Sequence, residues 1–249
     1  MHAVILAGGQ GVRLRPYTTC LPKPLVPIGN QYSILEIVLN QLRASGFTSA
    51  TLCIGHLGAL IHAFVGNGSK WNIEVDYAEE TTPLGTIGPI LQILDRLPEH
   101  FLAMNGDILT DLNYGKLLGH HIEVSAPLTI ATYEREVKID FGVLEESEFS
   151  GEIVSFKEKP SIHYSVSMGV YGLSRKTLEK YPKDQPFGFD QLVLDLLKRK
   201  TPPTGFKFNG YWLDIGRPDD YDRANNEFET LKPILMPDNP RSMQSLSLT

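Results

Sequence analysis

Short apolar runs rich in Val, Ile and Leu alternate with longer segments of helical period through the first 110 residues. This alternation is typical of a mostly parallel sheet with helices on both faces. We therefore predict an α/β fold. The strands are expected at residues 2–6, 49–54, 73–78 and 100–106.

The spacing of apolar residues predicts helices over 33–46 and 86–97, the second despite an internal proline. After residue 125, short apolar runs lie closer together between turn-forming residues, which predicts hairpins or a mixed sheet extending the first one. Helical patterns return at 190–200 and 218–231. The last dozen residues are predicted to be a mobile tail.

Composition narrows the class of partner. A chain of 249 residues with 42% hydrophobic content can bury a substantial core, as one large domain or two small ones. A net charge of −6, with acids and bases mixed throughout, excludes a polymeric nucleic acid or an anionic membrane as the partner. The sequence shows neither a membrane-spanning run nor a cleavable leader, so we expect a cytoplasmic protein. Cys20 and Cys53 lack metal-binding spacing and are expected to be reduced thiols.

The stretch "LAGGQGVRLRP", residues 6–16, follows directly on the first predicted strand. A glycine-rich turn there exposes backbone N–H groups to an anion, and glycine lets the main chain approach phosphate closely. A dinucleotide fingerprint would need a third glycine where Leu14 stands, and no Gly-Lys-Ser/Thr triplet of a P-loop occurs. On pattern alone, the alternative is a purely structural turn.

The continuation, "TTCLPKPLVPIG", places Lys23 between two prolines. Their rings restrict the backbone, so we expect a cation held on a stiff, extended segment. Arg13 and Lys23 together would bring two positive charges to a triphosphate. Taken alone, Lys23 is equally consistent with a solvated loop lysine.

"LAGGQGVRLRP" followed by "PKPLVPIG" resembles the signature of the sugar-1-phosphate nucleotidyltransferases, which make nucleotide-diphosphate sugars from a nucleoside triphosphate and a sugar 1-phosphate. The resemblance covers residues 1–230. It implies a single Rossmann-like domain of the nucleotide-diphospho-sugar transferase type, with a mixed, mostly parallel sheet flanked by helices. Residues 1–110 would bind the nucleotide and 111–230 the sugar phosphate, followed by a C-terminal tail, 231–249. Val12 stands where the family usually has Thr, which keeps the backbone cradle but removes a hydroxyl.

The segment "PLGTIG" indicates which nucleobase the chain would recognise. Gly85 and Gly88 flank Thr86 at a loop-to-helix junction, where backbone groups can read a nucleobase edge. This form resembles the guanylyltransferases for mannose- or heptose-1-phosphate, although uridylyltransferases for amino sugars have similar loops. The predicted nucleotide-binding residues are Leu6, Ala7, Gly8, Gly9, Gly11, Pro83, Gly85 and Thr86.

Two aspartates are candidate metal ligands. Asp107 follows the apolar run "FLAMNG" at the carboxyl end of a predicted strand, where open α/β sheets place ligands, and Asp214 interrupts the apolar run "YWLDIG". Mg²⁺ prefers one or two carboxylates together with phosphate oxygens and water. The resemblance implies that both aspartates hold Mg²⁺; a helix cap or a buried salt bridge is the alternative for each.

The second half supplies the predicted sugar contacts. The resemblance implies that Lys159 of "VSFKEKP" holds the sugar phosphate and that Glu158 contacts sugar hydroxyls, while Gly142 keeps the sugar pocket open. Many relatives have Asn-Ala-Gly where this chain has Ser-Met-Gly at 167–169, so Ser167 would contact the sugar with a shorter reach. The predicted sugar-binding residues are Asn105, Gly142, Glu158, Ser167 and Gly169.

The function implied is nucleotidyl transfer from an NTP, GTP in the first place, to a manno-configured hexose or heptose 1-phosphate, within surface polysaccharide synthesis. The predicted catalytic residues are Arg13, Lys23, Asp107, Lys159 and Asp214. Uridylyl, thymidylyl or cytidylyl transfer, and a non-catalytic regulatory relative that binds NDP-sugar, remain alternatives. A nicotinamide-dependent oxidoreductase is disfavoured because the second strand ends in Gly55 and His56 instead of an acidic residue. A homodimer, if formed, has to use the catalytic domain itself.

Overall fold

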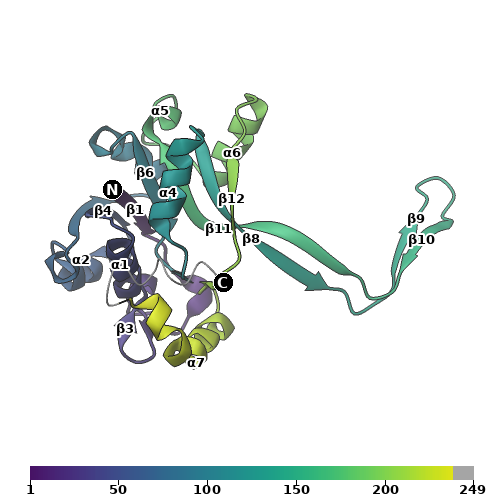
Figure 1. Ribbon diagram of the computed structural model, residues 1–249, viewed down its shortest axis with the longest axis horizontal. Coiled ribbons are helices and arrows are strands. Elements are labelled where there is room, and N and C mark those ends of the chain that lie inside the picture. The colour runs from purple at the N-terminus through teal and green to yellow at the C-terminus, as the bar shows by residue number, and fades with distance from the viewer. Residues whose placement is uncertain (238–249) are drawn as a thin grey trace.

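Seven strands form the central sheet of the computed structural model, which describes residues 1–237. In spatial order the strands are β12 (Thr204–Phe208), β8 (Leu128–Lys138), β11 (Ser161–Ser174), β6 (His100–Asn105), β1 (His2–Ala7), β4 (Ser49–Ile54) and β5 (Glu74–Glu79). β11 runs antiparallel to both of its neighbours, whereas the other pairs are parallel. The predicted mixed, mostly parallel sheet is confirmed, as are the four strands expected in the first half (Figure 1).

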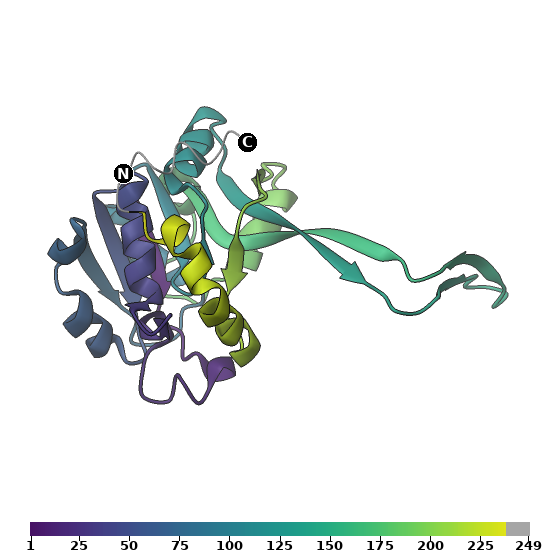
Figure 2. The same cartoon turned by 60° about the horizontal axis from the view of Figure 1, so that its bottom comes forward.

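The two faces of the sheet carry separate hydrophobic cores. Successive side chains of a strand point to opposite faces. Ala3, Ile5 and Ala7 of β1 accordingly join one core cluster, and Val4 joins the other. The first cluster is covered by α1 (Ile34–Ala44), α2 (Gly58–Val65), α4 (Tyr114–Glu123) and α7 (Pro218–Leu235), and the second by α3 (Gly88–Gln92), α5 (Arg175–Leu178) and α6 (Phe189–Lys198). Figure 2 shows α1 and α7 side by side on the first face.

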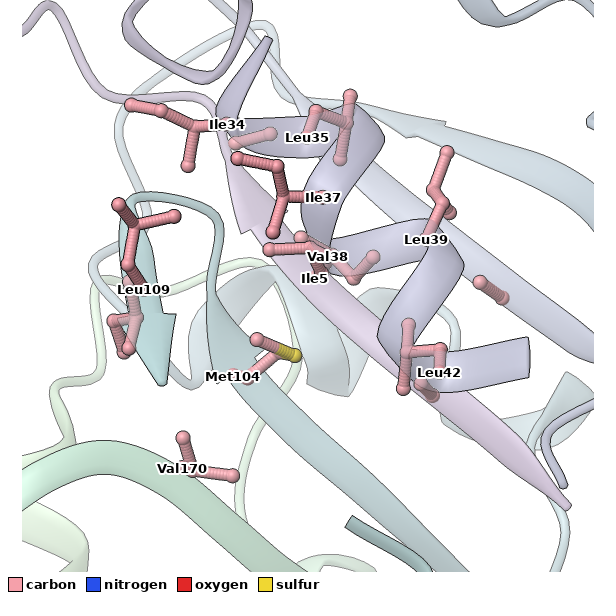
Figure 3. Packing of buried hydrophobic residues seen from close by; sticks show 14 of the residues in the cluster. Ile5, Ile34, Leu35, Ile37, Val38, Leu39, Leu42, Met104, Leu109 and Val170 are labelled. Carbon is pink, nitrogen blue, oxygen red and sulfur yellow. The ribbon is translucent and has the colours of Figure 1, made fainter. Parts of the chain in front are cut away.

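Helix α1 shows how the sequence pattern becomes packing. The Ser33 side chain caps its first turn by accepting a hydrogen bond from Glu36 N at 3.1 Å. Its apolar residues then fall on one stripe, which lies against β1 and β6 beside Ile5 and Met104 (Figure 3). The helix ends before Gly46, whose φ of +88° suits glycine at the position after a helix.

Two predicted segments differ from the structure. The helix expected over 86–97 is the short α3 followed by a 3-10 turn at Leu94–Arg96. Pro89 lies in the first turn of α3, where a helix needs no N–H donor, so it begins the helix instead of interrupting it. At the other end, α7 continues to Leu235, past the start of the predicted tail at 231. The predicted mobile residues at the extreme C-terminus, 238–249, lie outside the described part of the chain.

Strands β8 and β11 continue far beyond the sheet as a two-stranded arm, residues 134–165 (Figures 1 and 2). The pairing of β12 with β8 ends at Tyr133, and that of β6 with β11 ends at Val170. Outside the sheet the two strands therefore pair only with each other, from Ser165 opposite Glu134 outward. A second hairpin, β9 (Val143–Glu146) and β10 (Ile153–Lys157), forms the tip. The predicted hairpins are confirmed, but two of their strands are much longer than expected.

Three small elements complete the scaffold. The pair β2 (Pro27–Ile28) and β3 (Tyr32–Ser33) precedes α1. The antiparallel pair β7 (Ile108–Thr110) and β13 (Trp212–Asp214) joins the segment after β6 to the segment before α7. This pairing brings Asp214 opposite Ile108, one residue beyond Asp107.

Candidate active site

A cavity of about 430 Å³ opens at the carboxyl ends of β1 and β6. It lies where parallel strands of open α/β sheets present their loops to ligands. Many of the residues predicted from sequence line it, namely Leu6, Ala7, Gly8, Gly9, Gly11, Arg13, Lys23, Gly85, Thr86, Asn105 and Asp107. The sheet thus brings together residues as far apart in the chain as Leu6 and Asp107.

The glycine loop forms one wall of this cavity. Gly11 has a φ of +60° and begins a 3-10 turn, Val12–Leu14, that carries Arg13. The Thr18 side chain stabilises the loop, since its Oγ1 donates a 2.7 Å hydrogen bond to the Gly11 carbonyl. A Cβ on Gly9 would meet nothing within 4 Å, whereas one on Gly8 would lie 2.4 Å from Glu80 Oε2. The backbone at Gly9 is therefore open to a ligand, while Gly8 is needed for close packing behind it.

Lys23 and Asp107 form an ion pair across the floor of the cavity. Lys23 is buried and starts a 3-10 turn, Lys23–Leu25, instead of the fully extended segment expected from its two prolines. Pro22 is extended, but Pro24 lies inside the turn, since the φ that its ring imposes also suits a first helical turn. The two prolines still restrict the backbone beside Lys23, but its shape there is a 3-10 turn.

Asp214, at the end of β13, is the second carboxylate of the site. Burial and the charge of Asp107 raise the pKa of the Asp214 carboxyl, while Lys23 and Arg13 oppose the rise. A Cβ on Gly216 would lie 3.7 Å from Arg13 Nη2, which places the Arg13 guanidinium beside the same loop. Two carboxylates and two cationic side chains therefore lie close together in the site.

The donor set suits a hard divalent cation. Asp107 Oδ1 is buried and has no hydrogen-bond partner in the described part of the chain, although the other oxygen of that carboxylate faces Lys23. An orphaned carboxylate oxygen beside a second, partly desolvated carboxylate fits Mg²⁺, which takes one or two carboxylates and completes its shell with phosphate and water. Within residues 1–237 no group of three or more His, Cys, Asp or Glu side chains is placed to hold a metal.

The segment predicted to read the base is tied to the start of α6. Thr86 Oγ1 accepts a 2.7 Å hydrogen bond from Phe189 N, and the amides of Ile87 and Gly88 both donate to the Phe187 carbonyl. Gly85 has a φ of +79°, and a Cβ there would lie 2.9 Å from that same carbonyl. Pro83 lines an adjoining cavity of about 300 Å³ that shares Gly8, Gly9 and Gly85 with the first.

Glu80 is a site residue that the sequence reasoning missed. It lines both cavities, and its Oε1 accepts a 3.3 Å hydrogen bond from Leu84 N at the start of the base loop. Burial raises the pKa of the Glu80 carboxyl, and the Leu84 amide partly offsets this. The available signal was its position four residues before Leu84, at the carboxyl end of β5.

Three predicted sugar-binding residues lie next to each other at the inner end of the site. A Cβ on Gly169, whose φ is +75°, would lie 2.7 Å from Asn105 Nδ2. Ser167 Oγ accepts a hydrogen bond from Gly169 N at 3.3 Å and donates one to the Tyr171 hydroxyl at 3.2 Å. Within this structure Ser167 therefore supports the backbone that passes Asn105.

The other two predicted sugar-binding residues, and Lys159, which was predicted to be catalytic, are not brought to the cavity. Gly142, Glu158 and Lys159 lie on the arm, beyond the last strand pairs that connect it to the sheet. They are close to one another, since a Cβ on Gly142 would lie 3.3 Å from Glu158 Oε2. Lys159 adopts a left-handed backbone conformation, with a φ of +43°.

This architecture defines an α/β protein with a candidate ligand site at the carboxyl edge of its sheet. Comparison with known proteins narrows the class. The sequence matches the Nucleotidyl transferase family over residues 2–230, and the chain belongs to that family.

The names of the similar proteins specify different nucleotides. The chain is 31% identical over 242 residues to a glucose-1-phosphate adenylyltransferase of Geobacillus stearothermophilus, covering 86% of this chain and 62% of the relative. It is 30% identical over 226 residues to the mannose-1-phosphate guanylyltransferase catalytic subunit beta of Dictyostelium discoideum, covering 89% and 62%. The chain thus spans about three fifths of the length of these curated relatives.

A solved structure shares the fold. The crystal structure of HddC from Yersinia pseudotuberculosis, complexed with GMP-PN, matches with a TM-score of 0.70 and 30% identity, over 91% of this chain and 99% of that one. This match confirms the predicted fold type. In the described residues, no helix has the length and apolar character that crossing a bilayer requires. Both cysteines are free thiols, as predicted, and burial raises the pKa of Cys53 to about 12.

Proposed function

We propose that this chain transfers a nucleotidyl group from GTP to a manno-configured hexose or heptose 1-phosphate, releasing pyrophosphate. A phosphate oxygen of the sugar 1-phosphate attacks the α-phosphorus of the triphosphate. The bond between the α-phosphorus and the bridging oxygen to the β-phosphate breaks, and pyrophosphate leaves with that oxygen. The observation that carries the proposal is the cavity that combines the glycine loop with Arg13, Lys23 and Asp107, with the Asp214 carboxyl near enough to feel the charges of all three side chains.

The chain's own residues answer the main difficulty of this reaction, which is to hold two anions together. The open backbone at Gly9 offers amide groups to phosphate oxygens, and the Arg13 guanidinium lies at the same loop. Lys23 is held by its turn and by Asp107, so its charge is available at a fixed place. Charge that develops on the leaving pyrophosphate is stabilised by groups already oriented before the reaction.

Asp107 and Asp214 would hold Mg²⁺, with Asp107 Oδ1 and the Asp214 carboxylate as its protein ligands. Bound there, the ion would neutralise phosphate charge and orient the triphosphate. Lys23 reduces the repulsion between the two carboxylates and the incoming phosphates, because it already pairs with one of the two acids.

The choice of guanine rests on the base loop and on relatives. Gly85 and Thr86 line the cavity at the loop that Phe187 and Phe189 hold in place, so their backbone groups are fixed for reading a base edge. Guanylyltransferases are among the relatives, and HddC was solved with GMP-PN. The adenylyltransferase relative makes ATP with glucose 1-phosphate the second candidate pair.

Pyrophosphate release with Mg²⁺ tests the proposal directly. GTP, ATP, UTP, dTTP and CTP are each combined with the 1-phosphates of mannose, a manno-configured heptose, glucose and amino sugars. We expect the highest kcat/KM for GTP with a manno-configured partner. A preference for another pair keeps the reaction class and refutes the base and sugar assignment. No turnover across the panel, with NDP-sugar still binding, refutes catalysis in favour of a regulatory binding protein.

A further inference from the structure

The arm places its polar residues out of reach of the cavity in its own chain. Lys159 lies ten residues before Gly169, the residue of β11 that contacts Asn105 in the cavity wall. The ladder between β11 and β8 is continuous from Ser161 to Ser167, so this stretch is extended. Ten extended residues span about 30 Å, several times the reach of a lysine side chain. Figures 1 and 2 show the arm pointing away from the body in both views.

The arm also exposes an unusual amount of apolar surface. Phe149 is 99% exposed and Phe141 is 78% exposed. The large exposed apolar residues of the arm are Val137, Phe141, Leu144, Phe149, Ile153, Val154, Phe156 and Tyr164. A concentration of this kind on a thin ribbon marks a surface that is covered by another protein. A two-stranded ribbon of such length also lacks a core of its own.

The cavity, for its part, is short of positive charge. Among the residues that line it, the cations are Arg13 and Lys23, and Lys23 is already paired with Asp107. The reaction proposed above brings a second anion, the sugar phosphate, next to the triphosphate. The arm carries a cation, Lys159, beside Glu158 and Gly142.

We propose that the arm of one chain enters the cavity of a second copy of the same chain and completes its active site with Lys159 and Glu158. The exchange is reciprocal in a twofold dimer, so each copy supplies one arm and receives one. A second copy answers both observations at once, because the arm would supply the cation that the cavity lacks and would be partly covered by that copy. This inference rests on the proposed function for the role of Lys159.

Heterodimers of two inactive variants test the exchange. Lys159→Ala and Asp107→Asn chains carry different affinity tags, are co-expressed, and are purified on both tags. Rates are compared at a sugar 1-phosphate concentration far below KM, where the Lys159→Ala parent should lose about tenfold or more and the Asp107→Asn parent at least about a hundredfold. The heterodimer should recover about half of the wild-type rate per dimer, because one of its two cavities combines an intact Asp107 with an intact Lys159 from the partner. An inactive heterodimer would overturn the proposal.

The reciprocal pairing gives the opposite expectation and is the matched control. At the same low sugar 1-phosphate concentration, a wild-type chain paired with a Lys159→Ala, Asp107→Asn double variant should keep less than about a tenth of the wild-type rate, because each cavity lacks one of the two residues. If each site is completed within its own chain, this heterodimer instead keeps half of the wild-type rate, and the proposal fails. Lys157→Ala in place of Lys159→Ala controls for general damage to the arm, because Lys157 pairs with Glu145 on the tip hairpin at 3.7 Å.

Two measurements without substrate separate this inference from the proposed function. In an armless variant, residues 137–162 are replaced by Asn-Gly, which joins the directly opposed Glu136 and His163 through a two-residue turn. By sedimentation velocity at about 10 µM, the wild type should be a dimer and the armless variant a folded monomer. A monomeric wild type, or a dimeric armless variant, overturns the exchange. Should the armless chain not fold, a full-length Phe141→Ser, Phe149→Ser variant replaces it, with the same two outcomes.

A photo-crosslinker locates the arm. p-Benzoylphenylalanine at position 156 should link two chains, with the attachment on peptides that carry residues 8–13 or 105–107 of the partner. Links confined to the arm itself overturn the proposal. If the wild type shows no turnover in the substrate panel, the proposed function fails, while sedimentation and crosslinking still decide the exchange.

Discussion

The cavity and the arm hold the two halves of the predicted site, and they are built on different principles. The nucleotide residues come from loops at one edge of a parallel sheet, so the direction of the strands alone gathers them. The residues expected to hold the sugar phosphate lie on a ribbon that leaves the sheet where its neighbours β12 and β6 stop pairing. A parallel sheet assembles a site within one chain, whereas the residues of a projecting ribbon lie away from that site.

The metal ligands test the cavity with the largest expected effect. Asp107→Asn or Asp214→Asn should lower kcat in saturating Mg²⁺ by at least about a hundredfold, because each removes a charged oxygen from the proposed ion. Pyrophosphate release measures the loss, and circular dichroism checks the fold. Asp219→Asn, on the exposed first turn of α7, is the control and should be active. Full activity in Asp214→Asn would remove that residue from the metal site.

Loss of the cation on the arm should affect the KM of one substrate and not that of the other. Lys159→Ala on the arm should raise KM for the sugar 1-phosphate by about tenfold or more while leaving KM for the nucleotide nearly unchanged, since a charge-assisted contact is worth about 1.5–3 kcal/mol. Initial rates with each substrate varied in turn make the measurement. Lys157→Ala is the neighbouring control. Equal effects on both substrates would show that the arm does not serve the sugar phosphate alone.

The base loop tests the rigidity of the cavity wall. Gly85→Ala should raise KM for the nucleotide several-fold, because a Cβ would lie 2.9 Å from the Phe187 carbonyl and φ is positive there. Gly119→Ala is the matched control, since its Cβ would meet nothing within 4 Å on the exposed face of α4. That change should stabilise the protein by about 0.5–1 kcal/mol. An unchanged nucleotide KM in Gly85→Ala would place the base elsewhere.

A stability measurement compares a buried histidine of the body with an exposed one of the arm. His121 Nδ1 lies 3.0 Å from Thr129 Oγ1 and its Nε2 lies 3.1 Å from Ser174 Oγ. Burial, followed by the charge of His100, lowers the pKa of His121 from 6.5 to about 4. The unfolded chain therefore takes up a proton below about pH 6.5 that the folded chain refuses until about pH 4. Stability should fall as pH drops through that window, and this contribution is absent above it.

Urea unfolding at several pH values checks this expectation. His121→Gln should flatten the decrease in unfolding free energy between pH 6.5 and 4. His163→Gln on the arm, where the histidine is exposed beside Glu134, should leave the slope unchanged. A slope that is the same in His121→Gln as in the wild type would assign the acid sensitivity to other groups.

Several features of this protein could be predicted from its sequence alone. The apolar runs at 2–6, 49–54 and 100–106 became β1, β4 and β6, because a buried parallel strand needs continuous apolar residues. The glycine loop and Asp107 meet in one cavity because each follows such a strand by a short connection. Local chemistry and strand direction together determine this half of the site.

Tertiary structure decided the rest. The ion pair of Lys23 with Asp107 and the participation of Glu80 depend on contacts between residues far apart in the chain, for which sequence spacing holds no signal. The sequence of residues 157–160 would be the same whether their strand lay over the cavity or projected away from it, so the sequence does not predict their position. Beyond the ends of β12 and β6, the direction of β8 and β11 depends on which surfaces pack against them. Those contacts exist only once the sheet has formed.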